Sequence, residues 1–320
     1  MFDTLNFSNY ISKDLAFHLL ENTNLFPKKD NPLHNLETVY YNSNLKNYSV
    51  KLTHYLQSNT FFLKFEGSVA KFQRDENFTD LKKSDLLEFI QYLEEAIQIN
   101  VNGFKINRVD LSFNIEGILS ENVFEVLGTL KSAKKATNDS SITYTSNAFS
   151  LHIYNKMNEV RQKRKKTAKE KAFVEGADEL TKYEHRLESK HVKKLFKRDL
   201  IVSDLLDDKV IQTLTNSVLN AYNAIEKISE CTFNENLCEG KKDFELMLVL
   251  TKWTYSELEG KVNKCKRAKT FKRAADYTEL KTKWRKAFKE NKFEKVENET
   301  LKTLNEYFEN LPQHLKMLGF

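Results

Sequence analysis

Residues 107–114 read Asn107-Arg-Val-Asp-Leu-Ser-Phe-Asn114 and alternate between polar and apolar side chains. Because successive side chains of a β-strand point to opposite faces of a sheet, this period of two predicts a strand with one buried and one polar face. Val109 and Leu111 belong to the apolar set, and Arg108 and Asp110 belong to the polar set. The segment is therefore expected to pack its apolar face against the core and to present polar side chains on its other face.

The same alternation recurs elsewhere in the first 200 residues, in segments 61–66, 141–145, 150–154 and 182–188. Segments 141–145 and 150–154 are joined closely enough for an antiparallel hairpin. Between the strands, apolar residues recur at helical spacing over 84–100, and a Ser-Glu start predicts a helix over 120–134. The pattern predicts an α+β fold, in which helices cover one face of an antiparallel sheet and the other face stays open and polar.

The sequence changes character near residue 200. Beyond it the apolar residues recur every three or four positions, which predicts helices over 205–228, 244–262 and 276–292. We therefore expect one domain over residues 1–200 and a helical C-terminal domain over residues 201–320.

The composition narrows the class of protein. The chain has 320 residues and a formal net charge of +6, with no apolar run near the ~20 residues that a membrane span needs. A cytoplasmic protein without a membrane partner is expected. Its three cysteines fall in no zinc or disulfide spacing. Basic residues concentrate in 161–171 and 261–273, which indicates a nucleic-acid partner, although a solvated helix face explains such runs equally well.

The polar faces of the predicted strands carry acids beside one tyrosine. Carboxylates of neighbouring strands are ligands that Mg²⁺ or Mn²⁺ prefers, and the acids on this face are Asp110, Glu184, Glu66 and Glu188. Tyr154 is the candidate nucleophile, and Lys156 is the cation that would favour its phenolate. A catalytically inert sheet also alternates in this way, with such acids and bases forming cross-strand ion pairs, so the residues alone leave both interpretations open.

Three blocks follow one another along the chain: Arg108-Val-Asp-Leu-Ser-Phe, Leu151-His-Ile-Tyr-Asn-Lys-Met-Asn-Glu159 and Lys182-Tyr-Glu-His-Arg-Leu-Glu-Ser-Lys190. In this order they resemble the rolling-circle replication initiators of filamentous phages (the gene II endonuclease type) and of Rep_trans plasmids. A weaker fourth match is Phe65-Glu-Gly-Ser-Val-Ala-Lys-Phe72, so the resemblance covers about 60–198. Many such initiators bind metal through a His-hydrophobic-His strand, and this chain has no His-x-His. Metal ligation by Asp110 and Glu184 is therefore inferred from the shared face.

The resemblance implies a metal-dependent DNA nicking and strand-transfer endonuclease of a phage or plasmid in a bacterial host. Its matching tyrosine, Tyr154, would attack one strand at the origin, stay joined to the 5′ end and later reseal the strand. The partners implied are double-stranded origin DNA, single-stranded DNA, a host helicase and a polymerase, and a homodimer is left open. The helical C-terminal domain would then serve DNA binding, origin recognition or oligomerisation. The alternative is a non-catalytic origin- or operator-binding protein.

The residues expected to contact DNA share positive charge or a place on the polar face. They are Arg108, His152, Arg161, Lys163, Arg164, Lys165, Lys166, Arg186, Lys266, Arg267, Lys272 and Arg273. His185 alternates onto the apolar side of its strand, which predicts a buried core histidine. Tyr144 is the next nucleophile to test if Tyr154 is not the one.

Overall fold

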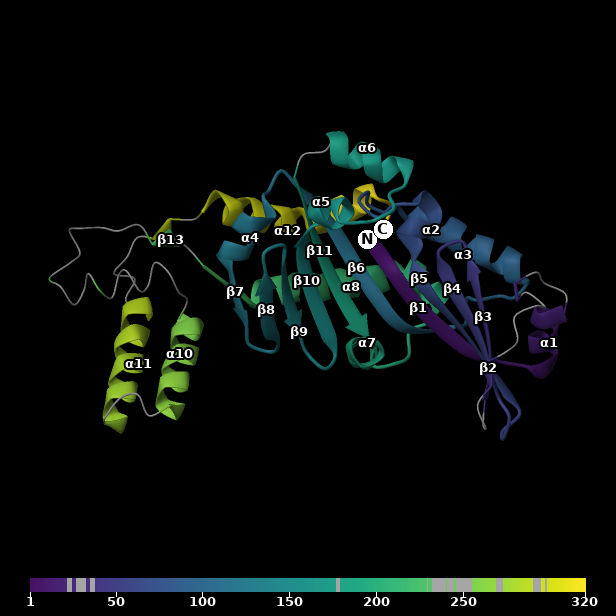
Figure 1. The fold of residues 1–320 in the computed structure, drawn as a ribbon, viewed down its shortest axis with the longest axis horizontal. Helices are drawn as coiled ribbons and strands as arrows, with labels where there is room; N and C mark the ends of the chain where they lie inside the picture. The colour runs from purple at the N-terminus through teal and green to yellow at the C-terminus, as the bar shows by residue number, and fades with distance from the viewer. Residues whose placement is uncertain are drawn as a thin grey trace.

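The structure is a computed structural model that describes residues 1–21, 25–26, 33–34, 38–176, 179–228, 230–231, 240, 245, 255–268, 273–289, 295–296 and 298–320. Within these residues the main element is a ten-stranded sheet in the order β2-β3-β4-β5-β1-β6-β11-β10-β9-β8 (Figure 1). Every neighbouring pair in it is antiparallel. The predicted α+β class is confirmed.

The strands of the large sheet are β1 (Phe2–Ile11), β2 (Leu33–His34), β3 (Thr38–Leu45), β4 (Tyr48–Tyr55), β5 (Thr60–Ser68), β6 (Lys105–Glu116), β8 (Lys134–Asn138), β9 (Ser141–Thr145), β10 (Phe149–Asn155) and β11 (Leu180–Glu188). Two small sheets pair β7 (Leu127–Leu130) with β12 (Ile225–Lys227), and β13 (Glu230–Cys231) with β14 (Lys295–Val296). The helices are α1 (Lys13–Glu21), α2 (Val69–Arg74), α3 (Lys83–Ile97), α4 (Ser120–Val126), α5 (Lys156–Arg161), α6 (Ala168–Gly176), α7 (Ser189–Phe196), the 3₁₀ helix η1 (Val202–Leu206), α8 (Asp208–Ala224), α10 (Tyr255–Arg267), α11 (Ala274–Lys289) and α12 (Glu299–Met317).

All five predicted strands are confirmed, as β5, β6, β9, β10 and β11. Their register aligns the polar faces across the sheet. Arg186 of β11 lies opposite Asp110 of β6, and Tyr154 of β10 lies opposite Lys182 of β11. The strict period of two in each strand therefore places these side chains on one side of the sheet, which we call the open face.

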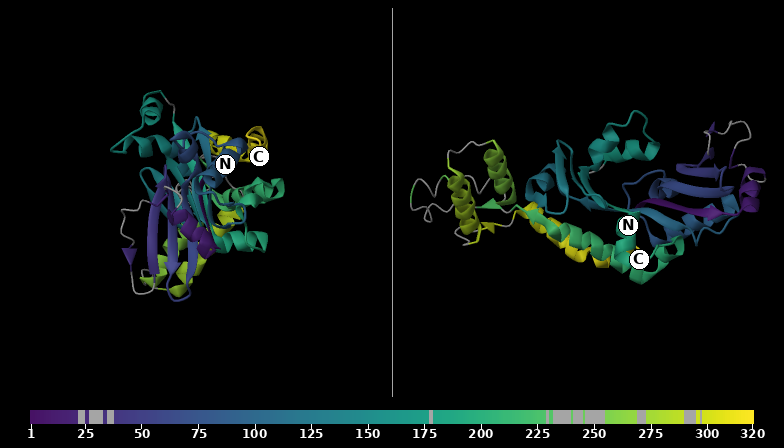
Figure 2. Two further views of the ribbon diagram at one scale, coloured as in Figure 1. Left: turned by 90° about the vertical axis from the view of Figure 1, so that its right-hand side faces the viewer. Right: turned by 90° about the horizontal axis from the view of Figure 1, so that it is seen from below.

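The hydrophobic core lies on the other side of the sheet and continues past residue 200. Helices α8 and α12 pack there, and Phe308 of α12 contacts Tyr183 of β11 with ring centroids 4.9 Å apart. Figure 2 shows α8 (green) and α12 (yellow) along one side of the sheet and α6 (teal) on the opposite side. The division into domains near residue 200 stays a prediction, although α8 and α12 share one core with the sheet.

The helix expected over 84–100 is confirmed as α3, whereas two other predicted helices differ from the structure. The helix expected over 120–134 is wrong beyond Val126, because the chain turns into β7, where Leu130 pairs with Ile225 of β12. Gly128 and Thr129 in this stretch are poor helix formers, so the strand pairing prevails. The helix expected over 205–228 is shorter, since α8 starts only at Asp208 and Ile225 begins a strand.

The other C-terminal helices are confirmed in part. The helix expected over 244–262 appears as α10 from Tyr255, and residues 246–254 lie outside the described residues. The helix expected over 276–292 appears as α11, which ends at Lys289, with residues 290–292 likewise outside them. Strands β1, β3 and β4 lie outside the segments predicted as strands. No helix of the described chain is long and apolar enough to span a bilayer.

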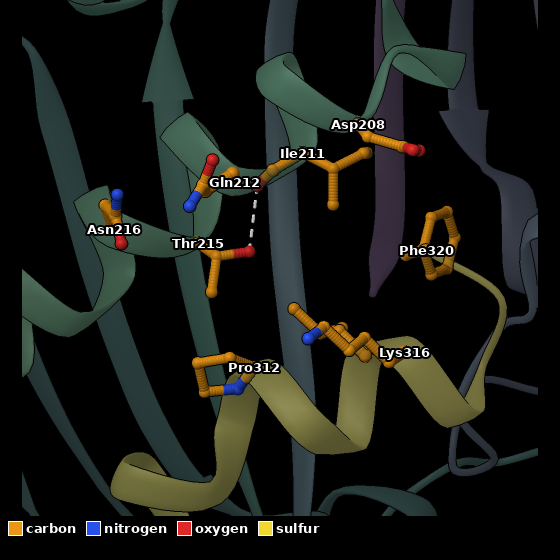
Figure 3. A pocket seen from close by; sticks show the side chains of 9 residues that line it. Asp208, Ile211, Gln212, Thr215, Asn216, Pro312, Lys316 and Phe320 are labelled. Atoms are coloured by element: carbon orange, nitrogen blue, oxygen red, sulfur yellow. Dashed lines mark hydrogen bonds between the residues drawn. The ribbon is translucent and has the colours of Figure 1, made fainter.

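A cavity of about 420 Å³ lies between α8 and α12 (Figure 3). Ile211 and Thr215 of α8 line it from one side, and Pro312 and Leu315 of α12 from the other. The two helices pack on the core side of the sheet, so the sheet separates this cavity from the polar side chains of the open face.

A candidate active site on the open face

Tyr154 lies near the end of β10 on the open face, with 9% of its surface exposed. Its hydroxyl donates a hydrogen bond to Oε2 of Glu184, 3.4 Å away, and its ring stacks on His152 at 4.6 Å between centroids. Burial, and then the negative charge of Glu184, raise the pKa of the Tyr154 phenol. The phenol is therefore protonated at neutral pH and needs a base to become a nucleophile.

Glu184 lies in the middle of β11 and is held largely out of water. Burial, reinforced by the negative charge of Asp3, raises the pKa of Glu184, while Lys182 and Arg186 oppose the change. The guanidinium Nη2 of Arg186 stands 3.9 Å from Oε1 of Glu184. A carboxylate whose pKa is moved toward neutrality, in contact with a phenol hydroxyl, is suited to accept its proton.

Lys156 stands beside the tyrosine, as the sequence predicts. Asn155 caps α5 by accepting a hydrogen bond from the backbone N–H of Asn158 at 2.9 Å, which turns Lys156 inward. The Lys156 side chain is fully buried, and its Nζ lies 5.8 Å from the centre of the Tyr154 ring and bonds to Asn77 and Glu159. Burial, then the charge of Lys182, lower the pKa of Lys156 to about 8.

A second buried lysine connects this site to β1. Lys182 Nζ donates to Oδ2 of Asp3 at 2.8 Å and to the backbone carbonyl of Asn77 at 3.0 Å. Ser68, the N-cap of α2, donates to the other oxygen of Asp3 at 2.8 Å. Burial favours the neutral acid, but Lys182, the hydrogen bond from Ser68 and the charge of Lys156 together lower the pKa of Asp3 to about 2.

Sequence reasoning missed Asp3 and Asn77. The register of β1 against β6 shifts between Phe2 and Thr4, so Asp3 sits in an irregularity that simple alternation does not reveal. Asn77 belongs to the loop between α2 and α3, where no repeating pattern marks a position. The apolar neighbour Phe2 is the one local sign that Asp3 is buried. A buried carboxylate needs a hydrogen-bond or ion-pair partner.

Asp110 is fully buried and engaged by two arginines. Arg108 Nε donates to Oδ1 of Asp110 at 2.8 Å, and Arg186 Nε lies 3.3 Å from both oxygens. The hydrogen bond to Asp110 raises the pKa of Arg108. Glu66 pairs with Lys64 at 2.7 Å and lies 3.8 Å from Arg108, whereas Glu188 is exposed opposite Arg108 in the register.

The four acids expected to bind Mg²⁺ or Mn²⁺ thus share the open face, and three of them form ion pairs there. Among the described residues no three His, Cys, Asp or Glu side chains converge in a way that could hold a metal ion. The carboxylate oxygens of Asp110 already accept bonds from Arg108 and Arg186, which leaves them poor ligands. The described side chains therefore do not fit a preformed protein metal site.

The predicted basic residues after Tyr154 lie on and between two short helices, α5 and α6. Arg161, Arg164 and Lys165 are exposed or nearly so, whereas Lys163 Nζ pairs with Glu170 at 2.6 Å and Lys166 Nζ donates to the Lys163 carbonyl at 3.0 Å. Helix α6 is anchored by Phe173, whose ring stacks on Phe78 at 4.1 Å. Helix α6 rises on the side of the sheet opposite α8 and α12 (Figure 2), the side that carries Tyr154.

Helices α10 and α11, which carry or adjoin the described C-terminal basic residues, lie apart from β10 and α5 (Figure 1). Arg267 is exposed on α10, and Arg273 pairs with Asp276 at 2.7 Å. Lys272 and the side chain of Lys266 lie outside the described residues. His185, predicted to be a core histidine, is 1% exposed, and burial lowers its pKa to about 3.

Comparison with known proteins bears on the first two thirds of the chain. The Phage_CRI family, described as the N-terminal part of a replication-associated protein, matches residues 1–206. A search of curated proteins finds no match. The matched range contains the complete open face, from Asp3 to Glu188, together with α5 and α6. The chain therefore belongs to the Phage_CRI family, the gene II type of rolling-circle replication initiators of filamentous phages.

Proposed function

We propose that this initiator nicks one strand of its replication origin with Tyr154 as the nucleophile. Tyr154 Oη forms a bond to the phosphorus, and the bond from phosphorus to the 3′ oxygen of the preceding nucleotide breaks. Glu184 takes the phenol proton, and the departing oxygen takes a proton from water to become a 3′-OH. The 5′ phosphate stays joined to the tyrosine, so a later attack by a 3′-OH reseals the strand without an external energy source.

The hydrogen bond of 3.4 Å from the Tyr154 hydroxyl to Glu184 is the observation that carries this proposal. It pairs a nucleophile with a base of raised pKa within one site. The scissile phosphate needs positive charge, and Arg186, with 38% of its side chain exposed, is a cation beside Glu184 that DNA can reach. Lys156 and Lys182 are too buried to touch a phosphate, so they act on the position of Tyr154 and Glu184.

A covalent adduct assay tests the nucleophile. Purified full-length protein is incubated with a 5′- or 3′-labelled single-stranded origin oligonucleotide and Mn²⁺, and adducts are resolved on denaturing gels. We expect an adduct with the fragment 3′ of the nick for the wild type and none for Tyr154→Phe, which should still bind DNA. Removing the hydroxyl costs little fold stability, because its partner Glu184 keeps its ion pair with Arg186.

Tyr144→Phe is the matched control. Tyr144 belongs to the neighbouring strand β9 but points to the core, where its hydroxyl donates to the Gly128 carbonyl at 2.8 Å. Tyr144→Phe should form the adduct normally. An adduct from Tyr154→Phe together with none from Tyr144→Phe would move the nucleophile to Tyr144.

The second candidate is an origin-binding protein without nicking activity. The ion pairs of Asp110 with Arg108 and Arg186 favour it, because the acids then serve the fold instead of chemistry. The same assay separates the two functions, since this protein would bind origin DNA and give no adduct under any divalent ion.

A further inference from the structure

A row of aromatic side chains crosses the open face at the end remote from Tyr154. Tyr10 of β1 lies opposite Phe62 of β5, Phe62 lies opposite Thr53 of β4, and Thr53 lies opposite Tyr40 of β3. They alternate along their strands with side chains of the buried core such as Phe61, Leu63 and Leu52, so they project from the polar side. We call Tyr10, Phe62 and Tyr40 the aromatic row.

Tyr10 is the most accessible member of the aromatic row, and Phe62 and Tyr40 are partly exposed. Tyr10 is 64% exposed, and its ring lies 5.1 Å from that of Phe62 with the planes inclined at 57°. Such exposure means that the Tyr10 ring adds little to the buried core of the fold. A flat, rigid ring held on a strand and open to solvent is suited to stack on a ligand.

Cations flank the aromatic row on the side that leads toward the active site. The neighbouring row in the register contains Lys64, opposite Ser8 of β1, and Lys51, opposite Lys64. Lys51 Nζ stands 4.1 Å from the centre of the Tyr40 ring, and Arg108 of β6 follows one register step further on. The rings thus lie in one row and the lysines in the next row, where Lys64 also pairs with Glu66 at 2.7 Å. Ring faces beside positive charge suit the bases and phosphates of an unpaired nucleic acid.

The open face continues from the aromatic row to the candidate active site along β6. This strand runs from Lys105, opposite Ser8, to Asn114, opposite Lys182 in the row of Tyr154. At ~3.3 Å for each residue, these two positions are roughly 30 Å apart, a distance that several extended nucleotides cover. One strand held at Tyr154 would thus reach the aromatic row across the same open face.

We propose that the aromatic row stacks on unpaired bases of single-stranded DNA and so holds the strand beside the nick. This assignment of a binding surface rests on the proposed nicking function. Duplex DNA keeps its bases stacked inside the helix and presents no base faces to a sheet, so the row selects the single strand. Stacking on Tyr10 and Phe62 is independent of base identity and serves strand retention.

Fluorescence anisotropy with a labelled oligo(dT) of about 20 nucleotides tests the proposal on the full chain. Tyr10→Ala/Phe62→Ala should weaken binding at least tenfold, because the double variant removes two rings on which bases stack. Tyr10→Trp should bind as tightly as the wild type. Tyr92→Ala is the control, since Tyr92 is 39% exposed on α3, which packs on the core side.

Three outcomes decide the result. A loss confined to single-stranded DNA in the double variant, with unchanged affinity for a blunt duplex and an unchanged melting temperature, supports the aromatic row as the site. Wild-type affinity for oligo(dT) in the double variant overturns the proposal, as does an equal loss for Tyr92→Ala. The binding measurement needs no nicking activity and is repeated in Tyr154→Phe. It therefore tests the aromatic row even if Tyr154 is not the nucleophile.

Discussion

The two ends of the open face differ in how their side chains are held. At one end, Tyr154 is 9% exposed and stands beside Lys156 and Lys182, which are buried and bonded to Asp3, Asn77 and Glu159. At the other end, Tyr10 is 64% exposed and packs against the ring of Phe62. Both ends come from strands of the same alternating pattern.

This difference in exposure corresponds to two roles, the positioning of reacting groups at the Tyr154 end and the binding of DNA at the Tyr10 end. Groups that perform chemistry must be fixed within a fraction of an ångström, and a buried, fully bonded network supplies that rigidity. Side chains that bind a flexible DNA strand instead stay exposed until the DNA covers them. We therefore expect substitutions at the Tyr154 end to change rate and stability, and substitutions at the Tyr10 end to change affinity alone.

The largest expected effect is on rate, from Glu184→Gln. This change keeps the shape of the side chain but removes the base that faces Tyr154, so single-turnover nicking of an origin oligonucleotide should slow by about 10²- to 10⁴-fold. Glu188→Gln is the control, because Glu188 is exposed on the same strand and should keep the wild-type rate. A normal rate in Glu184→Gln would contradict its role as base.

The next effect is on stability, from Lys182→Met. Removing this cation leaves the buried carboxylate of Asp3 without its main partner, which should lower the free energy of unfolding by about 3–5 kcal/mol in urea titrations. Lys64→Met removes an ion pair of similar length, but its partners are 36% and 42% exposed, so the cost should stay below about 1 kcal/mol. An equal loss of unfolding free energy in the two variants would contradict the proposed difference between the two ends of the open face.

The sequence predicts the sheet well because its signal is local. Five strands and the face shared by Asp110, Glu184 and Tyr154 follow from a period of two. Lys156 lies beside Tyr154 for another reason, because it is the first residue of helix α5. The prediction of a helix over 120–134 is wrong beyond Val126 because a distant strand, β12, pairs with residues 127–130. No local pattern reveals such a partner.

The candidate site is less predictable than the sheet. Alternation shows which side chains share a face but not how they pair, so Asp110 is predicted as a metal ligand although two arginines hold it. Asp3 and Asn77 reach Lys182 over sequence separations of 179 and 105 residues. A register irregularity in β1 and a loop place them there, and neither follows from residue periodicity.

A third and smaller effect concerns the basic residues that border the Tyr154 end. Replacing Lys163, Arg164, Lys165 and Lys166 with alanine should weaken DNA binding and flatten the slope of log affinity against log salt by about 0.7–0.9 for each phosphate that is no longer neutralised. Arg164 and Lys165 should account for most of this, because Lys163 is engaged with Glu159 and Glu170. An unchanged slope would show that this basic segment is merely solvated.

The smallest effect is a pH dependence whose sign differs between two acids of one network. The pKa of Glu184 is raised in the fold by burial and by Asp3, so its favourable contribution is full below the ordinary pKa near 4.5 and is lost as pH rises through the folded value. Glu184→Gln should therefore gain stability relative to the wild type as the pH of urea titrations rises from about 4 to about 8.

Asp3→Asn should show the opposite trend. With a folded pKa of about 2 against an ordinary value of 3.8, Asp3 stabilises the fold above pH 3.8 and loses that contribution as pH falls toward 2. The variant should consequently be least stable relative to the wild type near neutral pH, and the difference should shrink in acid. Parallel trends in Glu184→Gln and Asp3→Asn would mean that Lys182 compensates both carboxylates equally, and Glu184 would then lack the raised pKa that makes it a suitable base for Tyr154.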